Sequence, residues 1–442
     1  MGVQDTVFAF RNILKIRSFV LGRRIVNVIH VKGCDALKGE ITVQGSKNAV
    51  LPILAATILI NGVCVLENCP RISDVDCMLQ LLRSMGGKVC WDDRGLCVDT
   101  TALCESRLPK ELVSSMRSSV MLLGPLLAIC KEMSMSYPGG CVIGERPIDI
   151  HLQALEELGA SFCPESDGIR GKVSQFVGTH VVLRFPSVGS TENVIMAAVL
   201  AKGRTVLENC AREPEVQQLC SFLNAAGACI SGIGEKCLII DGVEKLHSLS
   251  FLVKADRIVA GTYLLATAAI GGEVWIKNAP VTEMESVLNI ARQLGCELDL
   301  GKEGFTVIQK ARPKSLAYME TSVYPGFPTD LQSVLLTVLS VSDAESVLEE
   351  KIFSDRFHTA GELVRMGAAI TIRDNCAYIN GVDRLIGRHV IAEDLRGGAA
   401  LVLAGLLAKG DTFINNCYYI ERGYENICRD FGLLGAYVEG IG

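Results

Sequence analysis

The sequence repeats one pattern six times, and this repeat limits the folds that are open to the chain. Each copy begins with a short polar or charged stretch followed by an apolar helical segment, as in GSKNAVLPILAATIL from Gly45. Each copy ends a second helical segment at a glycine, and these glycines are Gly86, Gly159, Gly227, Gly295, Gly367 and Gly435. Their spacing of about seventy residues is too long for a thin solenoid repeat and is typical of a compact α/β module.

Within one copy the pattern predicts strand, helix, strand, helix, strand, which favours parallel βα units with helices packed on sheets. A chain of 442 residues is long enough for two domains, so we expect three modules in each. Segments such as AVLPILAATIL from Ala49 and ALVLAGLLA from Ala400 are apolar nearly all round, which indicates buried helices. We therefore expect each domain to be a drum with three buried helices inside and sheets outside, and with the helix N-termini at one end.

The composition argues against several classes of protein. A formal net charge of −6 is unfavourable for a nucleic-acid partner, which normally requires a broad basic face. The 18 cysteines are scattered without a CxxC motif, which favours free thiols in a reducing cytoplasm. No histidine pair has metal-ligand spacing such as HExxH, so we expect no metal site. No apolar run reaches the roughly 18 residues of a membrane span, so we expect no membrane contact.

Residues 1–28 lie outside the repeat and are rich in Arg and Lys. Their apolar stretch SFVLG is too short for a secretory signal. A basic targeting peptide, a disordered extension and a start codon placed too early all remain open, and we expect a disordered extension outside the fold.

Three copies carry a cation at the start of the apolar helix, namely Lys47, Arg117 and Arg396. A helix N-terminus already carries about half a positive charge, so a cation there is unfavourable by roughly 0.3–1 kcal/mol. Three equivalent cases indicate a bound anion, phosphate or carboxylate, that contacts both the cations and the free backbone N–H groups. Asp330 takes the same place in its own copy, where it is either an ordinary N-cap or a base beside the cations.

The second copy departs from the pattern between Tyr137 and His151, where the sequence is YPGGCVIGERPIDIH. The glycines of this loop are typical of a mobile lid that closes on a substrate. Cys141 in its middle has little to pack against, whereas the other cysteines mostly fall in apolar segments. Because Arg146 follows five residues later and a nearby Arg lowers the pKa of a thiol, Cys141 is a candidate nucleophile or proton donor.

Ordered motifs along the chain resemble those of the UDP-N-acetylglucosamine 1-carboxyvinyltransferase family. They are GSKNAVLPILAA, PGGCVIGERPID, FPSVGSTENVIMAA, AREPEV, PGFPTD, IFSDRF, RMGA, DLRGGAALVLAG and ERGYENI. The resemblance runs from about Val31 to the C-terminus and implies the α/β enolpyruvyl transferase fold, a two-domain inside-out barrel of six modules. Residues 47–254 then form the domain with the Cys141 loop, and residues 29–46 plus 255–442 form the second domain.

The resemblance implies transfer of the enolpyruvyl group of phosphoenolpyruvate to the 3-hydroxyl of UDP-N-acetylglucosamine, with release of phosphate. This reaction is the first committed step of peptidoglycan synthesis and proceeds by addition followed by elimination. In the family, the cysteine that matches Cys141 protonates the methylene carbon of phosphoenolpyruvate, forms a covalent adduct with it and is alkylated by fosfomycin. The carboxylate that matches Asp330 accepts the proton of the sugar hydroxyl. The resemblance implies no cofactor, and we expect a monomer.

The resemblance also implies which residues bind the substrates. Those that match the phosphoenolpyruvate site are Lys47, Asn48, Arg356, Arg396 and Arg422, with Lys47, Arg396 and Arg422 stabilising charge as phosphate leaves. Those that match contacts to the nucleotide sugar are Arg117, Arg146, Pro147, Ile148, Asp149, Ile150, Ser187, Val188 and Ile352. Some members have a Lys where this chain has Phe185 and Pro186, which leaves a diphosphate contact there open.

Two alternatives belong to other classes. A sister enzyme that acts on shikimate 3-phosphate would share the fold and the phosphoenolpyruvate site, but it is not expected to carry the PGGC motif. A non-catalytic paralogue that only binds the nucleotide sugar is expected to lack Cys141, Asp330 or Lys47, and all three are present.

Overall fold

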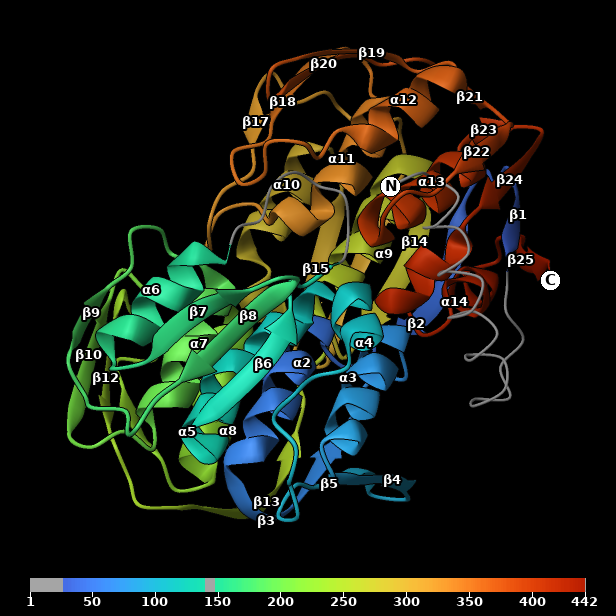
Figure 1. The fold of residues 1–442 in the computed structure, drawn as a ribbon. Helices are drawn as coiled ribbons and strands as arrows, with labels where there is room; N and C mark the ends of the chain where they lie inside the picture. Colours follow the sequence, from blue (N-terminus) through green and yellow to red (C-terminus); the bar gives the residue numbers. More distant parts are fainter. Residues whose placement is uncertain (1–26, 140–147, 442) are drawn as a thin grey trace.

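The computed structural model describes residues 27–139 and 148–441 (Figure 1). Six buried helices begin in the six copies of the sequence pattern, and their side chains are enclosed over most of their length. The helices α9, α11 and α13 contact one another, and α5 packs on α7. The six central helices are α2 (Lys47–Ala56), α5 (Leu123–Cys130), α7 (Val188–Ala198), α9 (Arg257–Ile270), α11 (Gln332–Leu339) and α13 (Leu395–Leu406).

A second helix in each copy ends in the same way. All six closing glycines predicted from the repeat have a positive φ, between 84° and 107°. The residue after each glycine donates its N–H to the carbonyl five residues earlier, as Gly87 does to Leu82 at 2.9 Å. This is the hydrogen bond of a left-handed helix cap, which favours glycine. These helices are α3 (Ser73–Ser84), α6 (Asp149–Glu157), α8 (Pro214–Ala225), α10 (Glu285–Gln293), α12 (His358–Arg365) and α14 (Ile427–Leu433).

The first half of the chain forms three open sheets. One contains β13 (Leu246–Leu252), β3 (Ile60–Glu67), β5 (Gly95–Asp99) and β4 (Lys88–Asp92), in that order. A three-stranded sheet contains β6 (Glu132–Ser136), β8 (Gly168–Lys172) and β7 (Ser161–Glu165). The third contains β11 (Cys229–Ser231), β12 (Cys237–Asp241), β10 (Arg204–Glu208) and β9 (His180–Val182).

The second half forms three more four-stranded sheets and one short pair. The first has the order β15 (Glu297–Gly301), β16 (Gly304–Gln309), β14 (Gly272–Lys277) and β2 (Leu37–Thr42). The second has the order β17 (Met319–Glu320), β18 (Glu345–Glu349), β20 (Cys376–Asn380) and β19 (Ala369–Arg373). The third has the order β22 (His389–Ile391), β24 (Asp411–Asn415), β1 (Val28–Lys32) and β25 (Val438–Ile441). The pair is β21 (Leu385–Ile386) with β23 (Ala408–Lys409).

The prediction of parallel pairing holds for β21 with β23, fails in the three-stranded sheet, where both strand pairs are antiparallel, and holds for only part of each four-stranded sheet. In each four-stranded sheet one pair is parallel, such as β13 with β3, and the other two pairs are antiparallel. The reason is the two-residue turn between strands such as β4 and β5, which can join only antiparallel neighbours. The remaining elements are the helix α4 (Lys110–Ser115) and the 3-10 helices η1 (Thr57–Leu59), η2 (Arg117–Leu122), η3 (Val281–Glu283), η4 (Thr329–Leu331) and η5 (Cys417–Arg422).

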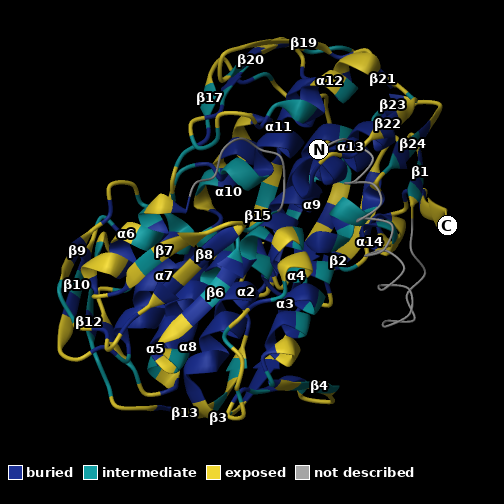
Figure 2. Cartoon of the chain, viewed as in Figure 1, coloured by how far each residue is buried: buried dark blue, intermediate teal, exposed yellow. Residues whose placement is uncertain are grey.

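The buried apolar side chains form two separate clusters. Buried segments, dark blue in Figure 2, occur in both halves of the chain. The first cluster lies within residues 49–253, and the second combines residues 29–43 with residues 255–438. Figure 1 shows β1 and β2, in blue, among the yellow and red elements of the second half. The domain bounds 47–254 and 29–46 plus 255–442 stay a prediction, which these two clusters support.

The chain passes between the two clusters at two neighbouring places. Gly45 and Ala255 form an isolated antiparallel bridge there. The N–H of Ser46 donates to the carbonyl of Lys254 at 2.8 Å, and the N–H of Asp256 donates to that of Gln44 at 2.8 Å. The two crossings are therefore held side by side by backbone hydrogen bonds.

The extension predicted for residues 1–28 overlaps the first strand by one residue. Val28 is the first residue of β1, where it is paired with Asn415 on one side and Ile441 on the other. Residues 1–26 lie outside the described part of the chain, so the prediction of disorder stays untested.

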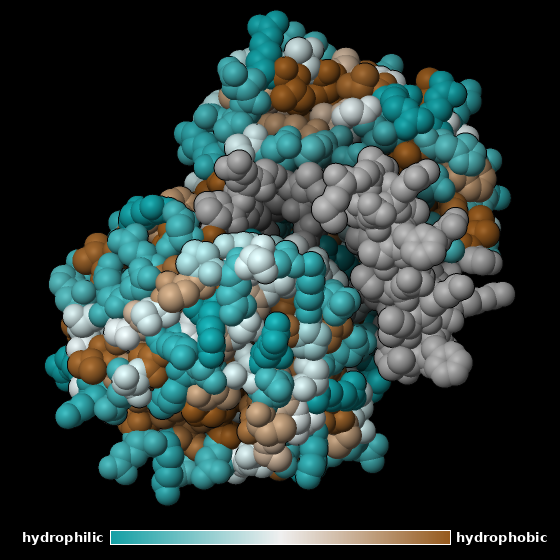
Figure 3. All heavy atoms as spheres, in the orientation of Figure 1, coloured by the Kyte–Doolittle hydropathy of each residue, from teal (hydrophilic) through white to brown (hydrophobic). Residues whose placement is uncertain are grey.

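Hydrophobic side chains on the face in Figure 3 are scattered among hydrophilic ones. Among the described helices, each is too short or too polar to cross a bilayer.

Candidate active site

The N-terminal ends of α2, α7, α9 and α13 surround one cavity of about 470 Å³, together with the 3-10 helices η2 and η4 that precede α5 and α11. Both hydrophobic clusters contribute helices to its walls, so the cavity lies between the two halves of the molecule. The helix-start residues that line it are Lys47 and Asn48, Arg117 and Ser118, Ser187 to Gly189, Arg257 and Ile258, Thr329 and Asp330, and Asp394 to Arg396. As predicted, the helix N-termini share one end, where their partial positive charges favour an anion.

Capping carboxylates allow these helices to begin with a cation. Asp394 accepts a hydrogen bond from the backbone N–H of Arg396 at 2.8 Å. Asp256 accepts from the N–H of Ile258 at 2.8 Å and from that of Lys47 at 3.0 Å, so it contacts the starts of both α9 and α2. A carboxylate at the cap offsets the repulsion between the helix dipole and the neighbouring cation.

Asp330 is held by three donors and does not cap a helix. Arg356 Nη2 donates to its Oδ1 at 2.9 Å, while Arg396 Nη2 and Asn48 Nδ2 donate to its Oδ2 at 3.0 Å and 3.1 Å. The 3-10 turn η4 begins after Pro328 without a side-chain cap. The N-cap interpretation of Asp330 is therefore wrong, and its predicted position beside the cations is confirmed.

The charges around Asp330 control its protonation. Burial alone would raise the pKa of this carboxyl, but Arg396, Arg356 and Lys47 outweigh that effect and hold the pKa well below its usual value. Arg396 Nη1 and Arg356 Nε are buried without a hydrogen-bond partner among the described residues. Both nitrogens therefore have a donor left for an acceptor group of a bound anion.

Lys47 and Arg422 share the carboxylate of Asp74, a residue that sequence analysis did not identify. Arg422 Nε lies 2.8 Å from Asp74 Oδ1, and Lys47 Nζ lies 3.2 Å from Oδ2. Asp74 stands in the first turn of α3, where an acidic residue is ordinary, so its position in the sequence carried no signal. Its role depends on a contact with Arg422, 348 residues away.

A second buried ion pair, between Arg257 and Glu215, lines the same cavity and was also missed. Arg257 Nε and Nη2 lie 3.0 Å and 3.2 Å from the two carboxylate oxygens of Glu215. Arg257 starts α9 much as Lys47 starts α2, so the repeat could have revealed it.

Behind this pair, Glu192 is fully buried, and its oxygens have no hydrogen-bond partner in the described chain. Burial, and then the charges of Glu215 and Glu213, raise the pKa of Glu192 well above its usual value.

The residues expected to contact the nucleotide sugar fall into three groups. Those that line the cavity are Arg117, Asp149, Ile150, Ser187, Val188 and Ile352. Ile148 instead belongs to the first hydrophobic cluster. Cys141, Arg146 and Pro147 lie outside the described residues, so their places stay predictions.

Arg184, which sequence analysis did not identify, lines the cavity next to Phe185 and Pro186 and forms an ion pair with Asp149. It supplies a cation near the position where some members of the resembled family have a Lys.

The described residues include no group of three or more His, Cys, Asp or Glu side chains placed to hold a metal ion. The cavity instead combines Lys and Arg side chains with carboxylates that are bound to them. Such a set of donors fits phosphate and carboxylate groups, and a carboxylate among them can move a proton.

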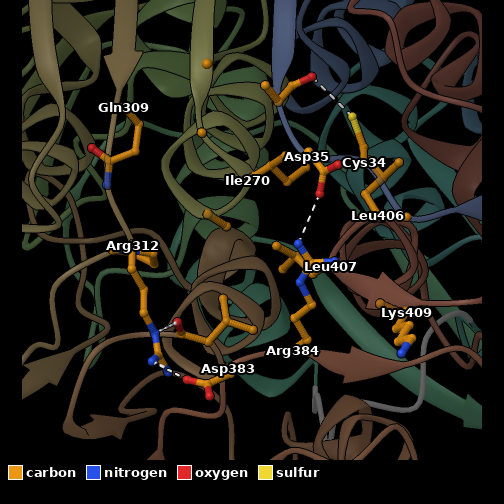
Figure 4. A pocket seen from close by; sticks show the side chains of 18 of the residues that line it. Cys34, Asp35, Ile270, Gln309, Arg312, Asp383, Arg384, Leu406, Leu407 and Lys409 are labelled. Carbon is orange, nitrogen blue, oxygen red and sulfur yellow. Dashed lines mark hydrogen bonds and ion pairs between the residues drawn. The ribbon is translucent and has the colours of Figure 1, made fainter.

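A second cavity, of about 810 Å³, lies at the opposite ends of α9 and α13 (Figure 4). Ile270, Leu406 and Leu407 from the ends of these helices line it. Four of its charged side chains form two ion pairs, Arg312 with Asp383 at 2.7 Å and Arg384 with Asp35 at 3.1 Å.

Comparisons with known proteins give one family and one fold. The family described as EPSP synthase (3-phosphoshikimate 1-carboxyvinyltransferase) matches residues 31–431. A UDP-N-acetylglucosamine 1-carboxyvinyltransferase 2 of Caldanaerobacter subterraneus subsp. tengcongensis is 45% identical, over 92% of this chain and 97% of that protein. A UDP-N-acetylglucosamine 1-carboxyvinyltransferase of Cellvibrio japonicus is 43% identical, over 93% of this chain and 98% of that protein.

Solved structures resemble this fold at low sequence identity. The enolpyruvyl transferase NikO from Streptomyces tendae superposes with a TM-score of 0.84 at 21% identity, covering 93% of this chain and 98% of that one. EPSP synthase from Acinetobacter baumannii gives a TM-score of 0.73 at 19% identity, covering 93% and 99%. The α/β enolpyruvyl transferase fold implied by the sequence motifs is thereby confirmed.

Proposed function

Because this chain belongs to the UDP-N-acetylglucosamine 1-carboxyvinyltransferase family, we propose that it transfers the enolpyruvyl group of phosphoenolpyruvate to the 3-hydroxyl of UDP-N-acetylglucosamine. Phosphate is the second product. The reaction opens peptidoglycan synthesis and so contributes to building the cell wall.

The observation that carries this proposal is the convergence of cations on one cavity at the helix N-termini. Four cations from both halves line it: Arg356 and Arg396 pair with Asp330, while Lys47 and Arg422 pair with Asp74. Phosphoenolpyruvate carries a phosphate and a carboxylate, so its negative charge requires several cations at once. Fixed cations of this kind stabilise the charge that develops as phosphate leaves.

The proposed mechanism is an addition followed by an elimination. Asp330 accepts the proton of the sugar 3-hydroxyl while that oxygen forms a bond to C2 of phosphoenolpyruvate. Cys141 supplies a proton to C3, and a tetrahedral intermediate results. In the second step the thiolate left on Cys141 accepts a proton from C3, the electrons of that C–H bond re-form the double bond, and the bond between C2 and the phosphate oxygen breaks. Asp330 releases its proton with the departing phosphate. Lys47, Arg396 and Arg422 stabilise the departing phosphate.

We also propose that the protein acts as a monomer in the cytoplasm. The described cysteines are all free thiols, as expected in a reducing compartment. Sedimentation equilibrium at several protein concentrations tests this proposal, because a dimer would give about twice the molar mass of the monomer.

Phosphate release from purified protein tests the reaction directly. We expect release with phosphoenolpyruvate plus UDP-N-acetylglucosamine, and none when shikimate 3-phosphate replaces the nucleotide sugar. Fosfomycin should abolish release in the unaltered enzyme but not in the Cys141→Asp variant, where no thiol remains to be alkylated. Release with phosphoenolpyruvate plus shikimate 3-phosphate, but not with the nucleotide sugar, would assign the chain to the sister reaction. No release with either acceptor in folded protein would leave only a binding role.

A further inference from the structure

Asp74 connects two cations that belong to different halves of the molecule. Lys47 starts α2 in the first half, and Arg422 ends η5 in the second. Asp74 Oδ1 accepts from Arg422 Nε at 2.8 Å, and Oδ2 accepts from Arg422 Nη2 at 3.3 Å. Lys47 Nζ lies 3.2 Å from the same Oδ2. One carboxylate therefore fixes the separation of the two cations.

The surroundings of Asp74 favour a fixed, ionised side chain. Asp74 is only 3% exposed. Burial alone would raise the pKa of its carboxyl, but the charges of Lys47 and Arg422 outweigh burial and lower the pKa below its usual value. A second hydrogen bond joins the segment before α3 to the segment after η5, because the N–H of Arg71 donates to Glu425 Oε1 at 2.6 Å.

We propose that Asp74 is a positioning residue that holds Lys47 and Arg422 at the spacing required by the leaving phosphate of phosphoenolpyruvate. Lysine has a long, flexible stem, so its ammonium group needs a partner to stay in one place. Moving a catalytic group by about 1 Å can cost about 10²-fold in rate. The proposal rests on the proposed function, since it names a residue that prepares the phosphate site of that reaction.

Steady-state kinetics of three variants tests the proposal. Asp74→Asn removes the charge, Asp74→Glu retains it, and Asp76→Asn is a matched control on the same helix outside the cavity lining. We expect Asp74→Asn to lower kcat/KM for phosphoenolpyruvate about 10²-fold while KM for UDP-N-acetylglucosamine changes less than about two-fold. Asp74→Glu should recover about ten-fold of this loss because it restores the carboxylate, but not all of it, because its longer side chain moves the carboxylate, and Asp76→Asn should match the unaltered enzyme.

Two results would overturn the proposal. One is an Asp74→Asn enzyme within about three-fold of the unaltered one. The other is an equal loss for both substrates with no recovery in Asp74→Glu, which is the pattern of a structural residue. If Asp74→Asn does not fold, Asp74→Glu decides alone: a higher KM for phosphoenolpyruvate but not for the nucleotide sugar supports the proposal, and unchanged constants overturn it.

Calorimetric binding of inorganic phosphate separates this inference from the proposed function, because it needs no turnover. We expect the unaltered protein to bind phosphate and Asp74→Asn to bind it at least about ten-fold more weakly. If the unaltered protein shows no turnover but binds phosphate with this difference, the proposed reaction fails and the role of Asp74 stands. Equal phosphate binding by the two proteins, or none by either, overturns the role of Asp74.

Discussion

The two ends of the same central helices carry two cavities with opposite properties. The cavity at the helix N-termini is the smaller, at about 470 Å³, and its Arg396 and Arg356 side chains are 4% and 5% exposed. The cavity at the C-terminal ends of α9 and α13 is larger, at about 810 Å³, but its Arg384 and Asp383 side chains are 66% and 95% exposed. The burial of the charged side chains, more than cavity size, therefore distinguishes the two ends.

The two ends differ in how far their charged side chains are buried. At the N-termini, buried cations are held by buried or half-buried carboxylates, and the helix dipoles add further positive potential. Charges that are removed from water interact strongly, whereas exposed ion pairs contribute little. We therefore expect substitutions at the first cavity to change catalysis and stability strongly, and matched substitutions at the second to change little.

The largest contrast should come from matched changes of a carboxylate to an amide. Asp330→Asn should lower turnover about 10³-fold, because an amide cannot accept the proton of the sugar hydroxyl. Asp383→Asn, in the second cavity, should leave turnover unchanged. Phosphate release under saturating substrates measures both. A comparable loss in the two variants would mean that the second cavity also serves the reaction.

Stability should show the same contrast. Glu215→Gln leaves the buried guanidinium of Arg257 without its partner, so the free energy of unfolding should fall by about 3–5 kcal/mol. Asp383→Asn breaks an exposed pair with Arg312 and should cost less than about 1 kcal/mol. Urea unfolding of the three proteins checks this. Equal costs would show that burial does not separate the two ends.

The pH dependence of stability tests the buried Glu192. Its pKa is raised in the native state, so the unfolded chain loses this proton at lower pH than the native protein does. The contribution of Glu192 is therefore most favourable below the unfolded pKa and is lost as pH rises towards the native pKa. Glu192→Gln should reduce the fall in the free energy of unfolding between pH 5 and pH 8, by about 1.4 kcal/mol for each unit of pKa elevation. The exposed Glu244→Gln should leave that fall unchanged, and identical pH profiles for all three proteins would contradict the prediction.

The smallest effect is expected at the rim of the second cavity. Arg384→Gln breaks the pair with Asp35, whose side chains are 66% and 89% exposed. The free energy of unfolding should change by less than about 0.5 kcal/mol, and added salt should remove even that difference. Urea unfolding in low and high salt measures it. A change of several kcal/mol would show that this cavity is organised by its charges after all.

Local patterns predicted the fold well, and contacts between distant residues explain most of what was missed. The six closing glycines and the apolar helices followed from spacing, because helix caps and buried helices leave local signals. The cations Lys47 and Arg396 were found because a charge at a helix start is locally unfavourable. Asp74 and the three donors on Asp330 left no such signal, since their partners lie far away in the sequence.

Strand direction and one residue's role were the points where local patterns misled. Alternation of strands and helices favours parallel sheets, but the short turns within each copy produce antiparallel pairs. A carboxylate before an apolar helix is usually a cap, and only the contacts of Asp330 with Arg356 and Arg396 exclude that role.

The placement of β1 and β2 in the second half has a consequence for the order of events during synthesis. His30 and Asp411 hydrogen-bond to each other from adjacent strands, yet they are 381 residues apart. At about 5–20 residues per second, β1 waits on the order of 20–80 s for β24 to leave the ribosome. During that time the first half, within residues 49–253, can complete its own core. The N-terminal strands meanwhile expose unpaired edges, which makes the newly made chain most prone to aggregation before its last strand appears.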